Sequence, residues 1–410
     1  MASLLPSIAL LLLTLPFPSI STSTSYITRH ASALYLTTPN SPTNSPTNTS
    51  TRFTASGANI YWLGLDENVI PPPSTPPAPF YAPLNASYPT RGRITEAMST
   101  VKIMGATTVR SQTLGVSVGN PLSVMPKLGE VNEGAWESMD WAVREAGRVG
   151  LRVFAPLTDN YDYYHGGKFV FLRWRGIDIG SAGSNIDPLV QQFYTNRTII
   201  DDFKNYIRIL LTHRNQFTNL TYAEDPTIFA YETGNELGGP TFGDKDVPAV
   251  WTHEILSYVK ELAPTKLTID GTYGINAEHL NLSSVDIFSD HFYPMDVDKL
   301  SAGVELVAGT DKVYLAAEYG WTPQTQSKTP MSEFFAWIEQ RQNHFWSYFG
   351  HNVPDCKTFV DHNDGLALQY GNPKNPVNYT TQISKIRQHL FKMQGIAVDE
   401  TLPPAPCPGN

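Results

Sequence analysis

The sequence predicts an α/β protein built as a (β/α)8 TIM barrel, in which eight parallel strands form a closed barrel surrounded by helices. Short apolar segments rich in β-branched residues alternate with longer amphipathic segments from about Phe53 onward. Eight such apolar segments can be found, the number that closes a barrel of this kind. Several end in polar side chains, and the carboxyl ends of barrel strands meet at one mouth.

The eight apolar segments are the predicted strands. In chain order they span 58–64, 106–111, 150–157, 227–232, 266–270, 286–292, 312–319 and 344–350. Because they are almost continuously apolar, we expect helices to cover the outer face of the sheet, as in parallel sheets. An open doubly wound sheet that binds a dinucleotide is the alternative, but no Gly-x-Gly-x-x-Gly motif follows the first strand.

Two of the intervening segments show helical periodicity most clearly. In the segment 93–105 the apolar residues Ile94, Met98, Val101 and Met104 lie on one helical face, and in the segment 136–150 Trp136, Met139, Val143 and Ala146 do the same. Both segments end in glycine, which often follows the last helical residue. We therefore predict a helix in each segment, packed against the sheet.

The amino-terminal residues 1–22 are predicted to be a signal peptide, because an apolar run is followed by small residues. A membrane anchor is the alternative, but prolines interrupt the run and it is shorter than the ~20 residues that span a bilayer. We expect a secreted, extracellular protein without a membrane segment in its mature form. Residues 23–52 are rich in Ser, Thr and Pro, and we predict that they form a flexible leader. We predict a barrel domain over residues 53–395 and a carboxyl-terminal tail over residues 396–410.

The composition excludes some partners and sites. The chain of 410 residues has 38 acidic and 29 basic residues, a formal charge of −9, and no basic run, so nucleic acid is not an expected partner. Cys356 and Cys407 could form one disulfide in an oxidising compartment or remain two unpaired thiols. No Cys/His spacing typical of a zinc site is present.

Sequons for N-glycosylation suit a chain that passes through a eukaryotic secretory pathway and predict a glycoprotein. They begin at Asn48, Asn85, Asn196, Asn219, Asn281 and Asn378.

Polar side chains at the predicted strand ends are the candidate functional residues. They are Arg110, Asp159, Asn160, Asn235, Glu236, His291, Tyr293, Glu318 and Trp346. Two glutamates accompanied by an Arg, a His, a Tyr and a Trp favour chemistry on a sugar ring, which needs an acid, a nucleophile, hydrogen-bond donors and an apolar surface for stacking. This pattern indicates a glycoside-cleaving site.

Each of these residues also has a structural interpretation when taken alone. A strand-end Glu such as Glu236 or Glu318 can belong to an ion-pair network, and Arg110 can be the partner of a carboxylate. His291 can be a hydrogen-bonded core histidine, and Trp346 can be core packing. The functional interpretation depends on the presence of all of them at the ends of different strands.

The chain resembles family 5 of the glycoside hydrolases, and within it fungal endo-β-1,4-mannanases, from about Phe53 to Phe349. The segments that match are ANIYWLG, GATTVRS, PLTDNYDYYHGG, FYTNRTIIDDFKNYIRILLTHRN, EDPTIFAYETGNE, SDHFYP and LAAEYGW. The resemblance implies a retaining double displacement with Glu236 as acid/base and Glu318 as nucleophile. We expect the charge of the nearby Glu318 to raise the pKa of Glu236 and so keep Glu236 protonated.

The resemblance also implies roles for the remaining site residues. Arg110 and Tyr293 would donate hydrogen bonds to the nucleophile, and Asn235 would bind the 2-hydroxyl of the sugar. His291 would orient its neighbours, and Trp346 would form the floor under the reacting sugar. No metal or organic cofactor is implied.

We expect a secreted monomer that cleaves β-1,4-mannan internally and has a polysaccharide or oligosaccharide as its partner. Family members of this kind commonly continue the Asn-Glu pair with Pro-Arg, whereas this chain has Leu237 and Gly238 there. The substrate alternatives are therefore a β-glucan or a β-mannoside cleaved from its end, as by other family 5 β-glycosidases. A non-catalytic sugar-binding barrel is the alternative of a different class.

Overall fold

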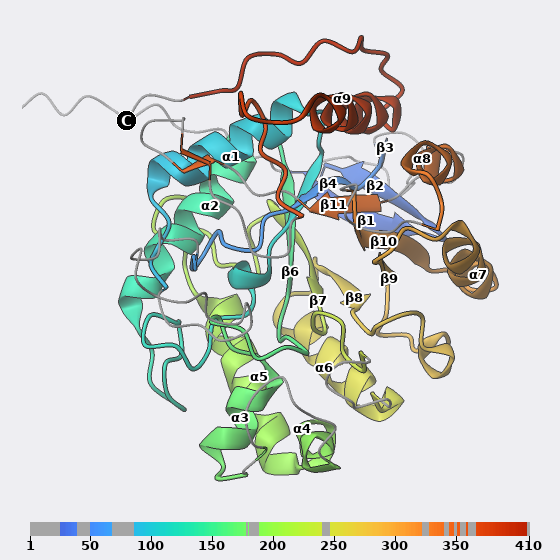
Figure 1. Cartoon of the computed structure of the whole chain (residues 1–410). Coiled ribbons are helices and arrows are strands. Elements are labelled where there is room, and N and C mark those ends of the chain that lie inside the picture. Colours follow the sequence, from blue (N-terminus) through green and yellow to red (C-terminus); the bar gives the residue numbers. More distant parts are fainter. Residues whose placement is uncertain are drawn as a thin grey trace, which may run out of the picture.

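Eight parallel strands form a closed barrel in the computed structural model of this chain (Figure 1). The strands are β4 (Ser56–Asn59), β5 (Thr108–Arg110), β6 (Arg152–Pro156), β7 (Ile228–Glu232), β8 (Leu267–Asp270), β9 (Ile287–Phe292), β10 (Val313–Tyr319) and β11 (His344–Ser347). Each pairs with the next along the chain, and β11 pairs with β4 through the register Ser347 to Asn59. The predicted (β/α)8 barrel is confirmed.

The structure describes residues 25–38, 50–67, 86–177, 179, 188–239, 247–321, 328–339, 344–347, 351–352, 358–359 and 366–407. The predicted signal peptide lies outside these residues, as do Asn48, Asn85 and Cys356.

Helices surround the barrel (Figure 1). They are α1 (Arg91–Ile103), α2 (Trp136–Arg148), α3 (Lys168–Trp174), α4 (Gln192–Thr195), α5 (Arg197–Thr212), α6 (Ala249–Leu262), α7 (Val297–Ala308), α8 (Met331–Glu339) and α9 (Val377–Lys392). Short 3-10 turns lie at Gln112–Leu114, Glu133–Ala135, Pro188–Gln191 and Ala277–His279. The apolar faces of the helices and the outer face of the strands share one large hydrophobic core.

Both helices that the periodicity predicts are present as α1 and α2, and both are followed by the expected glycine in a left-handed conformation. Gly105 has φ 89° and Gly150 has φ 74°, values that glycine adopts without strain. A Cβ at Gly105 would lie 2.6 Å from the Phe391 ring. The glycine after α1 therefore also allows α9 to pack closely against this turn.

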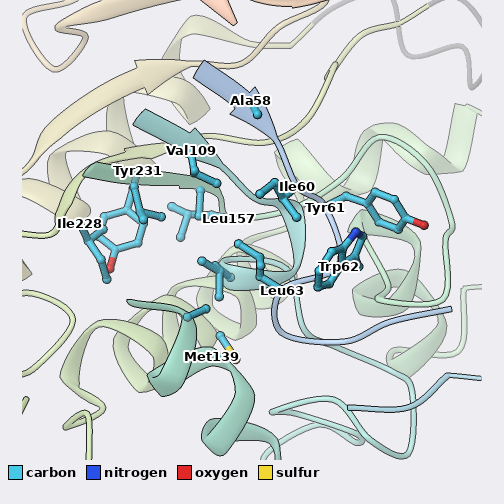
Figure 2. Close-up of a cluster of buried hydrophobic side chains, with 14 of the residues drawn as sticks. Ala58, Ile60, Tyr61, Trp62, Leu63, Val109, Met139, Leu157, Ile228 and Tyr231 are labelled. Atoms are coloured by element: carbon cyan, nitrogen blue, oxygen red, sulfur yellow. The ribbon is translucent and has the colours of Figure 1, made fainter. Parts of the chain in front are cut away.

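The first barrel strand begins and ends earlier than its sequence predicts. The apolar run 58–64 was expected to be the strand, but β4 ends at Asn59. Trp62 and Leu63 belong to the loop that follows, where they are buried in the cluster that includes Met139 of α2 (Figure 2). The apolar run is longer than the strand because this loop is also part of the core.

The leader predicted over 23–52 is in part a folded sheet, which corrects that prediction. Strands β1 (Tyr26–His30), β2 (Ala33–Thr37) and β3 (Thr51–Phe53) form an antiparallel sheet. Ile27 and Leu34 of this sheet are buried in one cluster with residues of β6 to β10. The Arg29 side chain donates to the carboxylate of Asp286, which precedes β9 (3.1 Å). Since these contacts lie at the starts of barrel strands, the sheet covers the amino end of the barrel.

The carboxyl-terminal tail packs along the domain. The Tyr370 hydroxyl donates to the carbonyl of Pro403 (2.6 Å), and the Ser384 hydroxyl donates to that of Glu400 (2.6 Å). Cys407 is disulfide-bonded. A further pair of short strands, β12 (His351–Asn352) and β13 (Thr358–Phe359), is antiparallel.

Candidate active site

Six of the seven residues to which the resemblance assigns a role come together at the carboxyl end of the barrel. They are Arg110, Asn235, Glu236, His291, Tyr293 and Glu318. They come from the ends of β5, β7, β9 and β10, four strands that are far apart in the sequence. The seventh, Trp346, belongs to β11, and its side chain lies outside the described part of the structure.

Arg110 is fully buried and connects the polar groups of this end of the barrel. Its Nε and Nη2 donate to Glu232 Oε2 (2.9 and 2.7 Å), and its Nη1 donates to Glu318 Oε1 (2.5 Å). Nη1 also donates to Asn59 Oδ1 (3.1 Å) and Nη2 to Asn235 Oδ1 (2.9 Å). Burial favours the neutral form, but the charges of Glu232 and Glu318 outweigh this effect and raise the pKa of Arg110. Arg110 is therefore a fixed cation.

The Glu318 carboxylate accepts hydrogen bonds on both oxygens. Oε1 accepts from Arg110 and from Gln112 Nε2 (3.3 Å), and Oε2 accepts from the Tyr293 hydroxyl (3.0 Å). The pairing of β10 with β9 shifts by one residue between Ala316 and Glu318, and such irregularities re-aim side chains beside functional sites. The bonds from Arg110 and Tyr293 are the ones that the sequence predicts.

Glu236 lies in a left-handed backbone conformation, with φ 53°. This conformation is uncommon for a residue with a side chain and costs on the order of 1 kcal/mol. It is held because Leu237 N donates to Gly271 O (3.0 Å) and Tyr273 N donates to Leu237 O (2.8 Å), which fix the segment against the chain after β8. The Glu236 side chain is thereby directed to the centre of the site.

Both oxygens of Glu236 have partners. Oε1 is 2.7 Å from His291 Nδ1, and Oε2 accepts from the Tyr161 hydroxyl (2.5 Å). One oxygen each of Glu236 and Glu318 and a ring nitrogen of His291 all lie within 4.8 Å of one another. Retaining glycosidases have their two carboxyl groups about 5–5.5 Å apart, whereas inverting enzymes have them about 6.5–9.5 Å apart. The arrangement is compatible with a retaining mechanism.

The pKa of Glu236 does not shift in the direction expected from the charge of Glu318. Burial raises it, but the hydrogen bond and positive charge of His291, together with the Tyr161 hydrogen bond, outweigh burial and lower the pKa of Glu236. Burial acts to lower the pKa of His291, but the charges of Glu318 and Glu236 and the bond to Glu236 raise it. In the free protein the proton of this pair is therefore held mainly by His291, because the carboxylates on both sides favour its charged form.

The Asn235 side chain has a fixed orientation. Its Oδ1 accepts from Arg110, and its Nδ2 donates to Asp159 Oδ1 (3.1 Å). The second oxygen of Asp159 lies 2.9 Å from His165 Nε2. Because an amide nitrogen carries two hydrogens, Asn235 Nδ2 keeps one of them for a further acceptor, as binding of a sugar hydroxyl requires.

Several groups that contact the site are not among the residues predicted from the sequence. They are Asn59, Gln112, Tyr161, His165 and Glu232. Glu232 is the polar end of the apolar segment 227–232 and Tyr161 follows the third strand, so the strand-end rule could have found both. Asn59 was placed inside the first strand, and its role depended on where that strand ends.

One group of described residues offers three potential metal ligands, namely Glu236, His291 and Glu318. Both carboxylates already accept hydrogen bonds from other side chains, on all four oxygens. These hydrogen bonds therefore orient the two carboxyl groups relative to each other, and no metal ion is needed for that orientation.

The Gly238 and Gly239 pair, which follows Leu237, has a conformation and surroundings that disfavour a side chain at either position. Gly238 has φ 76°. A Cβ at Gly239 would lie 3.0 Å from both Asn160 Nδ2 and the backbone oxygen of Glu236. The local backbone conformation thus suits the glycines of this chain better than a Pro-Arg pair.

Comparisons with known proteins agree with the geometry. Residues 83–304 match the family profile described as GH family 5 beta-mannosidase-like. Mannan endo-1,4-beta-mannosidase 8 of Oryza sativa subsp. japonica is 29 % identical over 245 residues, 58 % of this chain and 58 % of that protein. Mannan endo-1,4-beta-mannosidase 2 of the same species is 30 % identical over 246 residues, 58 % of this chain and 49 % of that protein. The chain spans about half the length of the curated relatives it matches.

Solved structures show the same fold. The endo-1,4-beta-mannanase from Rhizomucor miehei aligns with a TM-score of 0.66 at 19 % identity, and the alignment covers 91 % of this chain and 100 % of that one.

Proposed function

Because the chain belongs to the β-mannosidase-like group of glycoside hydrolase family 5, we propose that it is a retaining β-glycoside hydrolase that cleaves β-1,4-linked mannan internally. The observation that supports this most is the pair Glu236 and Glu318, which come from two strands and have oxygens within 4.8 Å of each other. Each has a different set of donors. Two carboxyl groups in different environments are what double displacement at a sugar requires.

In the first half of the reaction Glu318 attacks the anomeric carbon while Glu236 protonates the leaving oxygen. Arg110 and Tyr293 orient the attacking carboxylate. The proton shared with His291 moves to Glu236, since a bound sugar displaces water and burial favours the neutral carboxyl and the neutral imidazole. The bond to the leaving sugar breaks, and a glycosyl ester of Glu318 forms.

In the second half Glu236 removes a proton from water, and the resulting oxygen nucleophile attacks the same carbon and releases Glu318. Esterified Glu318 no longer carries a charge, so its repulsion of an ionised Glu236 is gone. The Asn235 amide, held between Arg110 and Asp159, donates its remaining hydrogen to the 2-hydroxyl, where contacts strengthen in the transition state. Two displacements restore the β configuration.

The names of the curated relatives support mannan as the substrate, and the missing Pro-Arg pair is the argument for the alternatives. A β-glucan differs from mannan in one hydroxyl of the reacting sugar, and a site built to hydrogen-bond that hydroxyl rejects the wrong epimer strongly. Removal of single mannosides from a chain end is the other alternative. A non-catalytic sugar binder is disfavoured, because both carboxyl groups and their donors are present.

The substrate is tested by measuring the release of reducing ends from galactomannan, glucomannan, carboxymethyl-cellulose and β-1,3-glucan in parallel. We expect the two mannans to be cleaved fastest, with a mixture of oligosaccharides as products. Faster attack on either glucan would contradict the substrate assignment, and release of mannose alone would contradict internal cleavage.

The proposed setting of the activity is extracellular. We propose that residues 1–22 are removed during secretion and that the mature protein is a glycosylated monomer. In the described part of the chain, no helix is long and apolar enough to span a membrane.

A further inference from the structure

Tyr161 contacts the proposed acid/base from the loop that follows β6. Its hydroxyl donates to Glu236 Oε2 at 2.5 Å. Its backbone N donates to Asp159 Oδ1 (3.0 Å), the same oxygen that accepts from Asn235 Nδ2. Its ring stacks on Tyr163, with centroids 5.1 Å apart and an interplanar angle of 22°. The hydroxyl is therefore fixed from both the backbone and the ring.

The two partners of Glu236 differ in their exposure. His291, which contacts Oε1, is 5 % exposed, whereas Tyr161, which contacts Oε2, is only partly buried. Since the partner of Oε2 is the more exposed of the two, this difference favours Oε2 as the oxygen that faces solvent. Oε2 is thus the oxygen that can reach the leaving group or the attacking water.

We propose that Tyr161 is a positioning residue for the acid/base, which holds Oε2 of Glu236 toward the substrate and stabilises its ionised form. This inference rests on the proposed function of Glu236. A phenol donates one hydrogen bond, and an ionised carboxyl oxygen is a stronger acceptor than a protonated one. Tyr161 therefore favours the state of Glu236 that activates water in the second half of the reaction.

The proposal predicts a shift in the pH dependence of Tyr161→Phe. The hydroxyl is one of the groups that lower the pKa of Glu236, so its removal raises that pKa. The first half of the reaction needs the proton that Glu236 shares with His291, and activity is lost as pH rises through the apparent pKa of this pair, which rises with the pKa of Glu236. The alkaline limb of kcat/KM on galactomannan should move upward by about 0.5–1 pH unit.

A second measurement does not depend on the substrate. The carboxyl carbon of Glu236 is titrated by NMR in protein labelled with 13C-glutamate, and its signal is assigned by its absence in Glu236→Gln. The midpoint should rise in Tyr161→Phe, and also in Tyr161→Leu, which removes the ring as well. If galactomannan were not the substrate, the activity profile would be absent while this titration would still report on Tyr161.

Tyr164→Phe is the matched control in the same loop. The Tyr164 hydroxyl donates to the Leu65 carbonyl (2.8 Å) in a buried position, so its loss weakens the loop without removing a donor to Glu236. We expect lower stability and unchanged titration. An unchanged NMR midpoint in Tyr161→Phe, or an equal rise in Tyr164→Phe, would overturn the proposal.

Discussion

Glu236 and Glu318 are the same residue type, and the different roles that we propose for them follow from their neighbours. Arg110 and Tyr293 donate to Glu318, which orients it as a carboxylate for attack. Glu236 instead contacts His291, which can exchange a proton with it, and Tyr161, which donates a hydrogen bond to it. The two glutamates should therefore fail differently when they are replaced.

We predict that Glu318→Ala loses about 10⁴-fold or more of the activity on all substrates, because no nucleophile remains. Glu236→Ala should lose about 10²–10⁴-fold on galactomannan but much less on an aryl β-mannoside whose leaving group needs no proton. Azide should restore the second variant by taking the place of water, and the product should be the β-glycosyl azide. Initial rates on the two substrates measure the losses of activity, and NMR of the product identifies the anomer of the azide.

An equal loss on both substrates for Glu236→Ala would contradict its role as the acid. An α-glycosyl azide would contradict double displacement. Glu232→Gln is a useful comparison, since Glu232 is a buried carboxylate that accepts from Arg110 and from the Ser289 hydroxyl. It should lower activity on both kinds of substrate to a similar extent.

At the scale of single residues, the sequence predicts the two glutamates and several of their strand-end partners, but not the partners that come from loops. The strand-end rule finds Arg110, Asn235 and Glu236 because polar residues after apolar segments are visible in a sequence. Asn59 depends on where its strand ends, and the contact of Tyr161 with Glu236 depends on the geometry of the loop after β6, so both need tertiary contacts. The direction in which the pKa of Glu236 shifts likewise depends on a 2.7 Å contact with His291, which the spacing of residues in the sequence does not predict.

Among the elements, the amino-terminal sheet differs most from its sequence prediction. The composition of 23–52 is typical of a flexible segment, yet Ile27 and Leu34 are buried beneath the barrel. Strands of only three to five residues leave too short an alternation for the pattern to be recognised, and burial by the barrel supplies what their own composition lacks. This sheet therefore forms because it packs against the barrel, and its own sequence does not suffice to predict it.

We predict that Leu34→Ala lowers the free energy of unfolding by about 2–4 kcal/mol, because it leaves a cavity in a fully packed cluster. The measurement is equilibrium denaturation in guanidinium chloride. The matched control is His30→Ala in β1, an exposed position where a change within about 0.5 kcal/mol is expected. Activity below the unfolding transition should be unchanged, since the sheet lies at the end of the barrel opposite to the site. Equal stability of Leu34→Ala and the wild type would show that this sheet does not contribute to the core.

At the scale of the whole molecule, the two ends of the barrel differ in the kind of contacts that they contain. The carboxyl end brings together the charged network around Arg110, and the amino end is sealed by apolar contacts and by Arg29. The closed barrel itself follows from the order of apolar and amphipathic segments, because all eight predicted strands overlap the observed ones. The sealing of the amino end was not predictable, since it depends on residues that precede the first barrel strand.

Two of the four described sequons lie toward the amino end of the barrel, opposite the site. Asn219 and Asn281 are exposed and lie in connections that lead from α5 to β7 and from β8 to β9, next to strand starts at the amino end. Asn378 is exposed in the first turn of α9. Asn196 is different, because its Oδ1 caps α5 by accepting from Thr198 N (3.1 Å) and its Nδ2 donates to Gln192 Oε1 (3.3 Å).

We predict that protein secreted from a eukaryotic host carries glycans at Asn219, Asn281 and Asn378 and none at Asn196, whose amide is already engaged in the helix cap. Peptide mapping after treatment with peptide N-glycosidase detects each occupied site as an Asn converted to Asp. Since Asn219 and Asn281 lie toward the amino end of the barrel, loss of their glycans should leave the rate of galactomannan cleavage unchanged, while the solubility of the protein falls. Asn219→Gln and Asn281→Gln should each remove one glycan without a change in kcat/KM. A glycan at Asn196, or unmodified asparagine at all three exposed positions, would contradict this distribution, and the second outcome would also count against secretion through a glycosylating pathway.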